Sequence, residues 1–418
     1  MAYTSAVMST ISNILKRKYL GPVRKQFAEE ILVQQILKLD RSNIKHNGTG
    51  LQAEIPLHTS GSSGVGSRDE LEDLPASGAQ RYQKAIYTLK HHYLRIQVSG
   101  QALHATSDAA GAFLQTYKAE LDGIRHDGAV EFARQTYGDG TGAIAALTDT
   151  TSGNTLVLTS AEALWKEYLY IGMKVDLGTV TDTNSLSVTP REITDVDIDA
   201  ASITIDGAAV DPATTHRVYR AGNVADDGTS KEMTGLAKLI PTAANTVGGI
   251  DSTAAGFKFW KPIIDSAGGS ITLSNLMKNW NKVKARGLKP GRAVALTTEG
   301  VARLLFESAD FKDKVRFVDS KMSLTGGYES IRFASGGSPV ELVADRLAPW
   351  GQVRFVDLDG LRIFGTGDWD YVAYQGSDVV QWVTNKHAFE SALFRFADLG
   401  TDRRNTSLLM SGLTDPGF

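Results

Sequence analysis

One long helical pattern constrains the fold of this chain more than any other feature. In "SDAAGAFLQTYKAELDGIRHDGAVEFARQTY", residues 107–137, apolar side chains recur on one stripe at helical spacing. A helix of this length would run about 45 Å at 1.5 Å per residue, whereas an average helix has only about 11 or 12 residues. The fold must therefore accommodate an unusually long helix. Its predicted stripe consists of Phe113, Tyr117, Leu121, Ile124, Gly128 and Phe132.

The glycine-rich segment that follows, "YGDGTG" at residues 137–142, has the composition of a phosphate-binding loop. Such a loop precedes a helix, because the helix N-terminus must face the anion. Here the glycines come after the helix, and the C-terminal end of a helix is partly negative. We therefore expect no nucleotide site. Instead, Gly138 is predicted to end the helix in the left-handed conformation, and Gly140 and Gly142 to carry the chain through a tight turn.

Two strand patterns before the helix are joined by a polar segment. "LQAEIPL" (residues 51–57) alternates like a strand, and residues 80–98 alternate for longer. Between them lies "HTSGSSGVGSRDELEDLPASG", which is rich in Gly and Ser. The pattern predicts an extended hairpin. A hairpin this polar cannot fold on a core of its own, so it needs another surface to lie on.

Charge is distributed unevenly along the chain. The net charge of −3 over 418 residues argues against a protein that is basic all over and coats nucleic acid. The first 45 residues nevertheless carry eight Lys or Arg against three Asp or Glu, a local excess of +5. Two interpretations stay open for this segment: an amphipathic helix with a solvated basic face, or an arm that lies on a polyanion.

Several classes of protein are excluded by composition. The chain has no cysteine, which rules out disulfides, thiolate metal sites and a cysteine nucleophile. No apolar run approaches the roughly 18 residues of a membrane helix. The start "MAYTSAVMSTISNILKRK" has no leading positive charge, so it is not expected to be a secretory signal. We expect a protein that is not exported and does not enter a membrane.

The remaining patterns mix strands and helices. Residues 148–223 turn to Thr, Val and Asp with frequent Gly, which predicts a small all-β insertion with the strands "MKVDL", "SLSVT", "REITDVDID", "SITID" and "HRVYRAG". Within it, Thr159 and Glu162 fit a capping box before a short helix. Residues 271–287 then predict an amphipathic helix that stops at Gly287. With no run of βαβ units and no internal repeat, the fold class is predicted to be α+β.

Three patterns that could carry chemistry each miss a requirement. "GSSGVG" (residues 61–66) approaches the Gly-x-Ser-x-Gly turn of serine hydrolases, but Val65 replaces the closing glycine and the segment lies in a hairpin tip. The adjacent His91 and His92 would point to opposite faces of a strand, which suits no shared metal. The third pattern has carboxylates at positions of a calcium loop, but the glycine that such a loop needs is missing. On a strand, these carboxylates would form an exposed acidic face instead. A weak cation site there stays open as the second interpretation. Its carboxylates are Asp195, Asp197, Asp199 and Asp206.

No catalytic, cofactor-binding or metal-ligating residue is nominated from the sequence, and the chain is not expected to be an enzyme. The densest polar cluster near the end is "DLGTDRRN", residues 398–405. Arg403 and Arg404 in it could form ion pairs with a neighbouring subunit or lie on a solvated strand end. Both interpretations stay open.

The order of these parts resembles the major capsid protein of tailed double-stranded DNA bacteriophages, which has the Hong Kong 97-type fold. The resemblance rests on the basic start, the polar hairpin, the long helix with "YGDGTG", the segment "EMTGLAKLI" (residues 232–240) and the closing "TDRRN". It implies a basic N-terminal arm (1–46), an extended E-loop (47–92), a peripheral domain with the spine helix (93–147), an inserted β-rich domain (148–224), a connection within the peripheral domain (225–270), an axial domain (271–375) and C-terminal strands of the peripheral domain (376–418).

The resemblance also implies a function. Hexamers and pentamers of the chain would form an icosahedral shell around phage DNA, assembled in the host bacterial cytoplasm and located in the virion capsid. Its partners would be other copies of itself, portal and scaffolding proteins, a possible decoration protein, and packaged DNA touched non-specifically by the inner face and the N-terminal arm. The alternatives are the shell protein of an encapsulin nanocompartment and, from another class, a monomeric β-rich surface-binding module. Many relatives lack the insertion, and no cross-linking Lys–Asn pair can be nominated.

Overall fold

The protein is described by a computed structural model that divides into two compact units. The described residues are 36–42, 44–47, 50–100, 110–148, 152–266, 268–288, 293–308, 330–335, 338–372 and 381–415. Most of the predicted basic arm thus lies outside them, and in the long helix side chains are described from residue 120 onward. Unit 1 contains Lys90–Met233 and Thr366–Ala397, whereas unit 2 contains Ile36–Leu89, Thr234–Gly365 and Asp398–Phe418.

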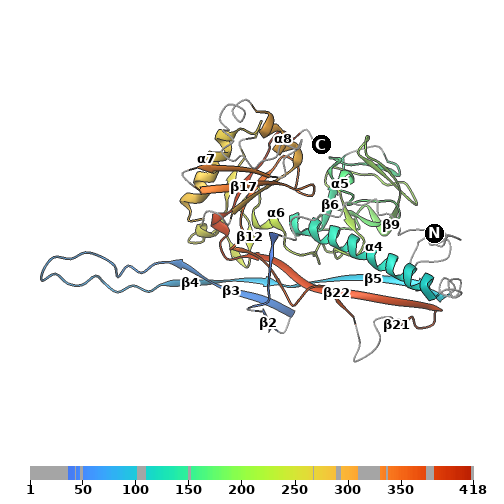
Figure 1. Ribbon diagram of the computed structural model, residues 1–418, viewed down its shortest axis with the longest axis horizontal. Helices are drawn as coiled ribbons and strands as arrows, with labels where there is room; N and C mark the ends of the chain where they lie inside the picture. The colour runs from blue at the N-terminus through green and yellow to red at the C-terminus, as the bar shows by residue number, and fades with distance from the viewer. Residues whose placement is uncertain are drawn as a thin grey trace. The chain divides into compact units, whose positions relative to one another are not determined.

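Unit 1 is built on a long helix and a strand pair. The helix α4 (Ala110–Tyr137) packs against β5 (Lys90–Ser99), which pairs antiparallel with β22 (Ala388–Thr401), as Figure 1 shows. Two short strands, β20 (Asp370–Tyr371) and β21 (Gln381–Trp382), also pair with β22. The helix is present where the sequence predicts it. On the predicted stripe, Leu121 and Phe132 are buried, and the side chains of Phe113 and Tyr117 lie outside the described residues.

The end of α4 differs in one detail from the prediction. The helix stops at Tyr137, as expected, but Gly138 keeps helical hydrogen bonding, since its N–H donates to the carbonyl oxygen of Arg134 at 2.9 Å. The left-handed conformation falls instead on Gly140 (φ 76°) and Gly142 (φ 84°). A Cβ on Gly142 would lie 2.5 Å from a methyl carbon of Val224. This glycine is therefore required both by its φ angle and by close packing.

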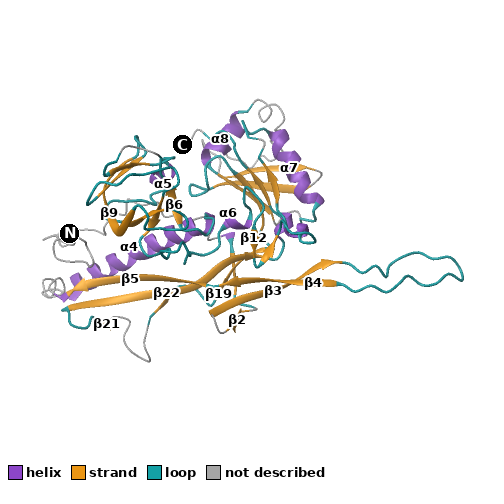
Figure 2. Ribbon diagram, turned by 180° about the vertical axis from the view of Figure 1, so that it is seen from behind, coloured by secondary structure: helices purple, strands orange, loops and turns teal. Residues whose placement is uncertain are grey.

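Residues 143–220 of unit 1 form a closed six-stranded sheet, called the barrel below. All neighbouring strands are antiparallel in the order β6-β11-β8-β9-β10-β7. The sheet closes where the N–H of Thr148 donates to the carbonyl oxygen of Val157 and that of Thr159 to the carbonyl oxygen of Ala146, both at 2.9 Å. Figure 2 shows these strands as the group that contains β6 and β9. The elements are β6 (Ala143–Ala146), β7 (Thr155–Val157), α5 (Glu162–Trp165), β8 (Lys174–Gly178), β9 (Ser187–Asp197), β10 (Ser202–Ile205) and β11 (Arg217–Arg220).

Two predictions for this region are wrong in detail. The strands expected at "SLSVT" and "REITDVDID" are the single strand β9, because the exposed Pro190 lies at a shift in the β8–β9 register, where a proline is tolerated. The capping box is absent. The hydroxyl of Thr159 donates to the carbonyl oxygen of Ala146 at 3.2 Å, and Ser160 instead accepts from the N–H of Glu162 at 3.1 Å.

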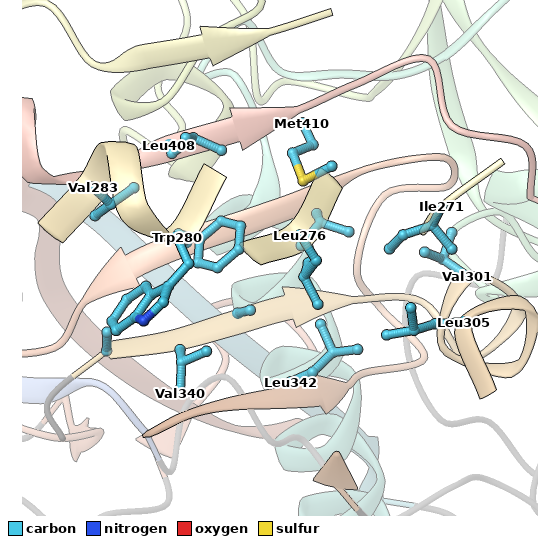
Figure 3. Packing of buried hydrophobic residues seen from close by; sticks show 14 of the residues in the cluster. Ile271, Leu276, Trp280, Val283, Val301, Leu305, Val340, Leu342, Leu408 and Met410 are labelled. Carbon is cyan, nitrogen blue, oxygen red and sulfur yellow. The ribbon is translucent and has the colours of Figure 1, made fainter. Parts of the chain in front are cut away.

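A mixed sheet with two helices forms the core of unit 2. Its order is β14-β23-β18-β15-β17-β16. Leu276, Trp280 and Val283 project from α7 into the cluster drawn in Figure 3. Thr272 caps this helix, and Gly287 (φ 92°) ends it as predicted. The elements are β14 (Ile263–Asp265), α7 (Leu273–Ala285), β15 (Ala293–Thr297), α8 (Glu299–Glu307), β16 (Ser330–Ser335), β17 (Ser338–Ala344), β18 (Val353–Asp357) and β23 (Leu408–Met410).

The predicted hairpin also belongs to unit 2. The long strand expected over residues 80–98 is wrong as one element, since β4 pairs with β3 and the chain beyond Leu89 pairs with β22. The buried side chains change from odd positions (Ala85, Tyr87 and Leu89) to even positions (Ile96 and Val98), and this change of phase accompanies the change of partner. The remaining elements of the unit are β1 (Lys38–Asp40), β2 (Ile44–Asn47), β3 (Gly50–Ser60), β4 (Arg81–Thr88), α6 (Leu236–Leu239), β12 (Thr246–Val247), β13 (Ile250–Asp251), η1 (Lys258–Trp260), β19 (Leu361–Gly365) and η2 (Arg404–Thr406). The predicted α+β class is confirmed.

Candidate assembly surfaces

The hairpin of β3 and β4 is fixed at its base. The hydroxyl of Tyr87 donates to the carbonyl oxygen of Thr401 (2.9 Å) and accepts from the N–H of the same residue (3.2 Å). Its ring stacks on Phe364, with the two centroids 5.8 Å apart. Burial raises the pKa of the Tyr87 phenol, so the hydroxyl remains protonated and keeps its donor role. Gly400 leaves room for this ring, because a Cβ there would lie 2.9 Å from it.

The middle of the hairpin has one packed face and one exposed face. On the packed face, Ala85 meets the β12–β13 turn, where a Cβ on Gly248 would lie 2.9 Å from the Ala85 methyl. On the other face, the carboxylate of Glu54 lies 3.2 Å from Lys84 and 3.6 Å from Lys45 of β2. Exposed pairs of this kind contribute little stability. The hairpin is thus held by its base and its inner face.

The tip of the hairpin, residues 61–80, projects beyond the paired strands as the loop at the end of β3 and β4 in Figure 1. Four carboxylates and one arginine give it a net charge of −3. Its side-chain hydrogen bonds stay local, such as Ser62 to the carbonyl oxygen of Gly78 (2.7 Å). Three large aliphatic side chains are almost fully exposed: Val65 (88%), Leu71 (101%) and Leu74 (86%). These side chains are available for contact with a partner surface.

The outer face of α7 carries a groove of about 440 Å³. This face lies opposite the buried Leu276, Trp280 and Val283. The surrounding sequence is basic, because residues 252–288 contain six Lys or Arg and one carboxylate, Asp265. Asp265 pairs with Lys282 at 3.1 Å, and the net charge of the segment is +5. The groove is lined by Leu273, Ser274, Met277, Lys278 and Asn281.

A buried ionic cluster ties the end of α4 to β11 within unit 1. Arg134 of α4 donates to Glu131 at 2.6 Å and to Glu232, and Arg220 of β11 lies 3.4 Å from Glu131. Burial alone would raise the pKa of Glu131, but the two guanidinium groups hold it well below its usual range. Burial raises the pKa of Glu232 despite Arg134. Because such pairs are costly to break, the cluster fixes the helix end on the barrel.

Arg404 contradicts both interpretations made for it. Its side chain is fully buried and neither meets solvent nor reaches a neighbouring subunit. The guanidinium donates to the carbonyl oxygen of Leu239 at 2.6 Å and to the side-chain oxygen of Asn245. Burial lowers the pKa of Arg404 to about 10. The adjacent Arg403 is half-exposed and lies 3.9 Å from Asp357, a distance too long for a hydrogen bond.

The residues that the sequence suggested for chemistry do not assemble. Asp195 and Asp197 are exposed on β9, Asp199 lies in the next turn, and Asp206 accepts from the N–H of Glu192 at 2.8 Å. Within the described ranges, no group of three or more His, Cys, Asp or Glu could hold a metal ion. Nor does any helix of the described chain have the length and apolar character needed to cross a membrane.

His91 and His92 contact different rings, as their alternation on β5 requires. His91 lies against Phe396 (centroids 4.6 Å apart) and His92 against Phe132 (5.4 Å). Burial, with a contribution from Arg395, lowers the pKa of His92 to about 4. His92 is therefore a neutral packing residue near pH 7. Sequence reasoning missed the α7 groove, the buried ionic cluster at the end of α4 and the role of Arg404. Only the groove had a signal in the sequence, which is the run of lysines in α7.

Comparison with known proteins places the fold. No family model and no curated protein sequence matches the chain. Among solved structures, the capsid asymmetric unit of cyanophage A-1(L) aligns with a TM-score of 0.57 and 14% identity, covering 98% of this chain and 100% of that one. The capsid of the native GTA particle aligns with a TM-score of 0.50 and 13% identity, covering 99% and 100%. The chain therefore has the fold of a phage capsid protein over nearly its whole length, and the predicted resemblance is confirmed for the fold.

Proposed function

We propose that the chain is a major capsid protein whose copies form hexamers and pentamers of an icosahedral shell around packaged phage DNA. The observation that carries the proposal is the alignment with the cyanophage capsid over 98% of this chain. The exposed hairpin tip supports it, since three aliphatic side chains there have no partner within the described chain. Assembly would bury them.

Each main element corresponds to a part of the capsid fold in this proposal. The hairpin of β3 and β4 is the E-loop, which lies over a neighbouring copy, and α4 is the spine helix. The barrel is the inserted domain of the peripheral domain, and the unit 2 sheet with α7 and α8 belongs to the axial domain. The ionic cluster of Arg134 keeps spine and insertion together.

Charge supports an assignment of faces. The barrel contains five basic and eleven acidic residues between residues 143 and 220, so DNA phosphates would repel it. We place it away from the DNA, where a decoration protein could bind. The N-terminal arm, with its excess of +5, would meet the DNA together with the inner face of the shell. Portal and scaffolding proteins are the further partners, the host bacterial cytoplasm is the place of assembly, and no enzymatic role is proposed.

The proposal is tested by expressing the chain alone and with neighbouring genes, followed by negative-stain electron microscopy and light scattering. Closed shells or capsomer rings are expected, and shells formed during infection should protect DNA from nuclease. Shells that lack DNA and carry a co-purifying enzyme would favour an encapsulin. A stable monomer under every condition, including co-expression with a scaffold, would overturn the proposal in favour of a surface-binding module.

A further inference from the structure

We propose that the hairpin tip of one copy (residues 61–80) docks in the α7 groove of a second copy. This inference rests on the proposed function, in which copies assemble side by side, and it names the surface that receives the hairpin. Both surfaces belong to unit 2 of their own copies.

Contacts within the tip hold its two arms together. Its two arms approach closely, because a Cβ on Gly78 would lie 2.4 Å from the hydroxyl oxygen of Ser63. Arg68 donates to the carbonyl oxygen of Asp73 at 2.9 Å, and the N–H of Glu72 donates to Asp69 at 3.2 Å. These contacts organise the loop before it binds, which lowers the entropy lost on docking. They also leave the aliphatic side chains turned to solvent.

The α7 groove has apolar surface and positive charge that complement the aliphatic, acidic tip. Met277 is partly exposed and supplies apolar surface, whereas Leu273 is mostly buried in the core beneath it, and Lys278 is exposed beside them. Helical spacing places Lys284 on the same stripe, seven residues beyond Met277. The segment that contains α7, residues 252–288, has a net charge of +5, and Lys278 is the charged residue that lines the groove, whereas the tip has a net charge of −3. Opposite charges of this size favour correct register and fast encounter more than raw affinity.

DNA is the competing occupant of the α7 face, since lysines also bind phosphates. The apolar lining decides between them. Duplex phosphates make no use of the partly exposed Met277, whereas Leu71 or Leu74 of the tip would bury against it. We therefore favour the tip of a second copy and keep DNA as an outcome of the test.

The absence of cysteine in the chain allows a direct test by cross-linking. Full-length Leu74→Cys and Ser274→Cys variants are prepared separately, mixed during assembly and treated with a short bis-maleimide. A covalent dimer should form at least tenfold more in the mixture than in either variant alone. The matched control mixes Leu74→Cys with Val188→Cys, since Val188 on β9 is as exposed (86%) but lies outside the groove.

A charge exchange supplies the second readout. Lys278→Glu with Lys284→Glu should lower the cross-linked fraction at least fivefold, and adding Glu70→Lys with Asp73→Lys in the partner copy should restore it. If capsomers form but the cross-link stays at the control level, the docking site is wrong and the proposed function stands. If the lysine changes reduce DNA retention and leave the cross-link intact, the α7 face binds DNA instead. If neither shells nor capsomers form, the proposed function and this inference both fail.

Discussion

At the scale of single residues, Arg404 is the clearest case of a side chain that holds its unit together. It is fully buried and donates to main-chain oxygens around Leu239 and Asn245. Arg404→Leu should destabilise the unassembled protein by about 2–4 kcal/mol, because the change leaves buried carbonyl oxygens without a donor. The shift is measured as a lower midpoint of thermal or urea unfolding.

The neighbouring arginine is the control for this prediction. Arg403→Leu removes the same charge from a half-exposed side chain whose nearest carboxylate, that of Asp402, is 3.8 Å away. A change within about 1 kcal/mol is expected. Equal effects of the two substitutions would contradict the role assigned to Arg404.

At the scale of elements, the packing of α4 on β5 depends on one glycine. A Cβ on Gly128 would lie 2.5 Å from a methyl carbon of Leu94, whereas a Cβ on Gly123 would meet nothing within 4 Å. Gly123→Ala should stabilise the protein by about 0.5–1 kcal/mol through helix propensity. Gly128→Ala should destabilise it by about 1–3 kcal/mol, because the helix must move off the strand. Unfolding midpoints of the two variants measure the difference, and stabilisation by both would refute the close contact.

The same elements show what a sequence can predict. The helix of α4, the hairpin of β3 and β4, and the stop at Gly287 follow from local periodicity and turn chemistry, and all are present. The division of residues 80–98 between two sheets was missed, because the second partner, β22, lies about 300 residues later in the chain; the change of the buried side chains from odd positions (Tyr87) to even positions (Ile96) was an unused signal. The burial of Arg404 was missed for a similar reason. Its partners lie on α6 and the following turn, about 160 residues earlier in the chain.

At the scale of the whole molecule, the barrel should fold by itself and the hairpin should not. The barrel has its own core. The strands at the two ends of this segment of the chain, β6 and β11, pair with each other, with Ala143 opposite Tyr219. Residues 143–220 expressed alone should give a dispersed NMR spectrum and a cooperative thermal transition. Residues 50–89 alone should remain unfolded, since a lone hairpin is marginal in water. An unfolded barrel fragment would show that α4 is needed to support it.

Closure of this sheet also has a consequence for crowding. An open sheet exposes a row of unpaired N–H and C=O groups that can recruit the same strand from another molecule. In a shell, every copy would carry this module, so its local concentration would be high. A high local concentration favours pairing between the open sheet edges of neighbouring copies. The hydrogen bonds of Thr148 and Thr159 remove that edge. Lengthening a barrel loop should then leave the protein soluble, which makes this module a suitable position for displaying a foreign peptide.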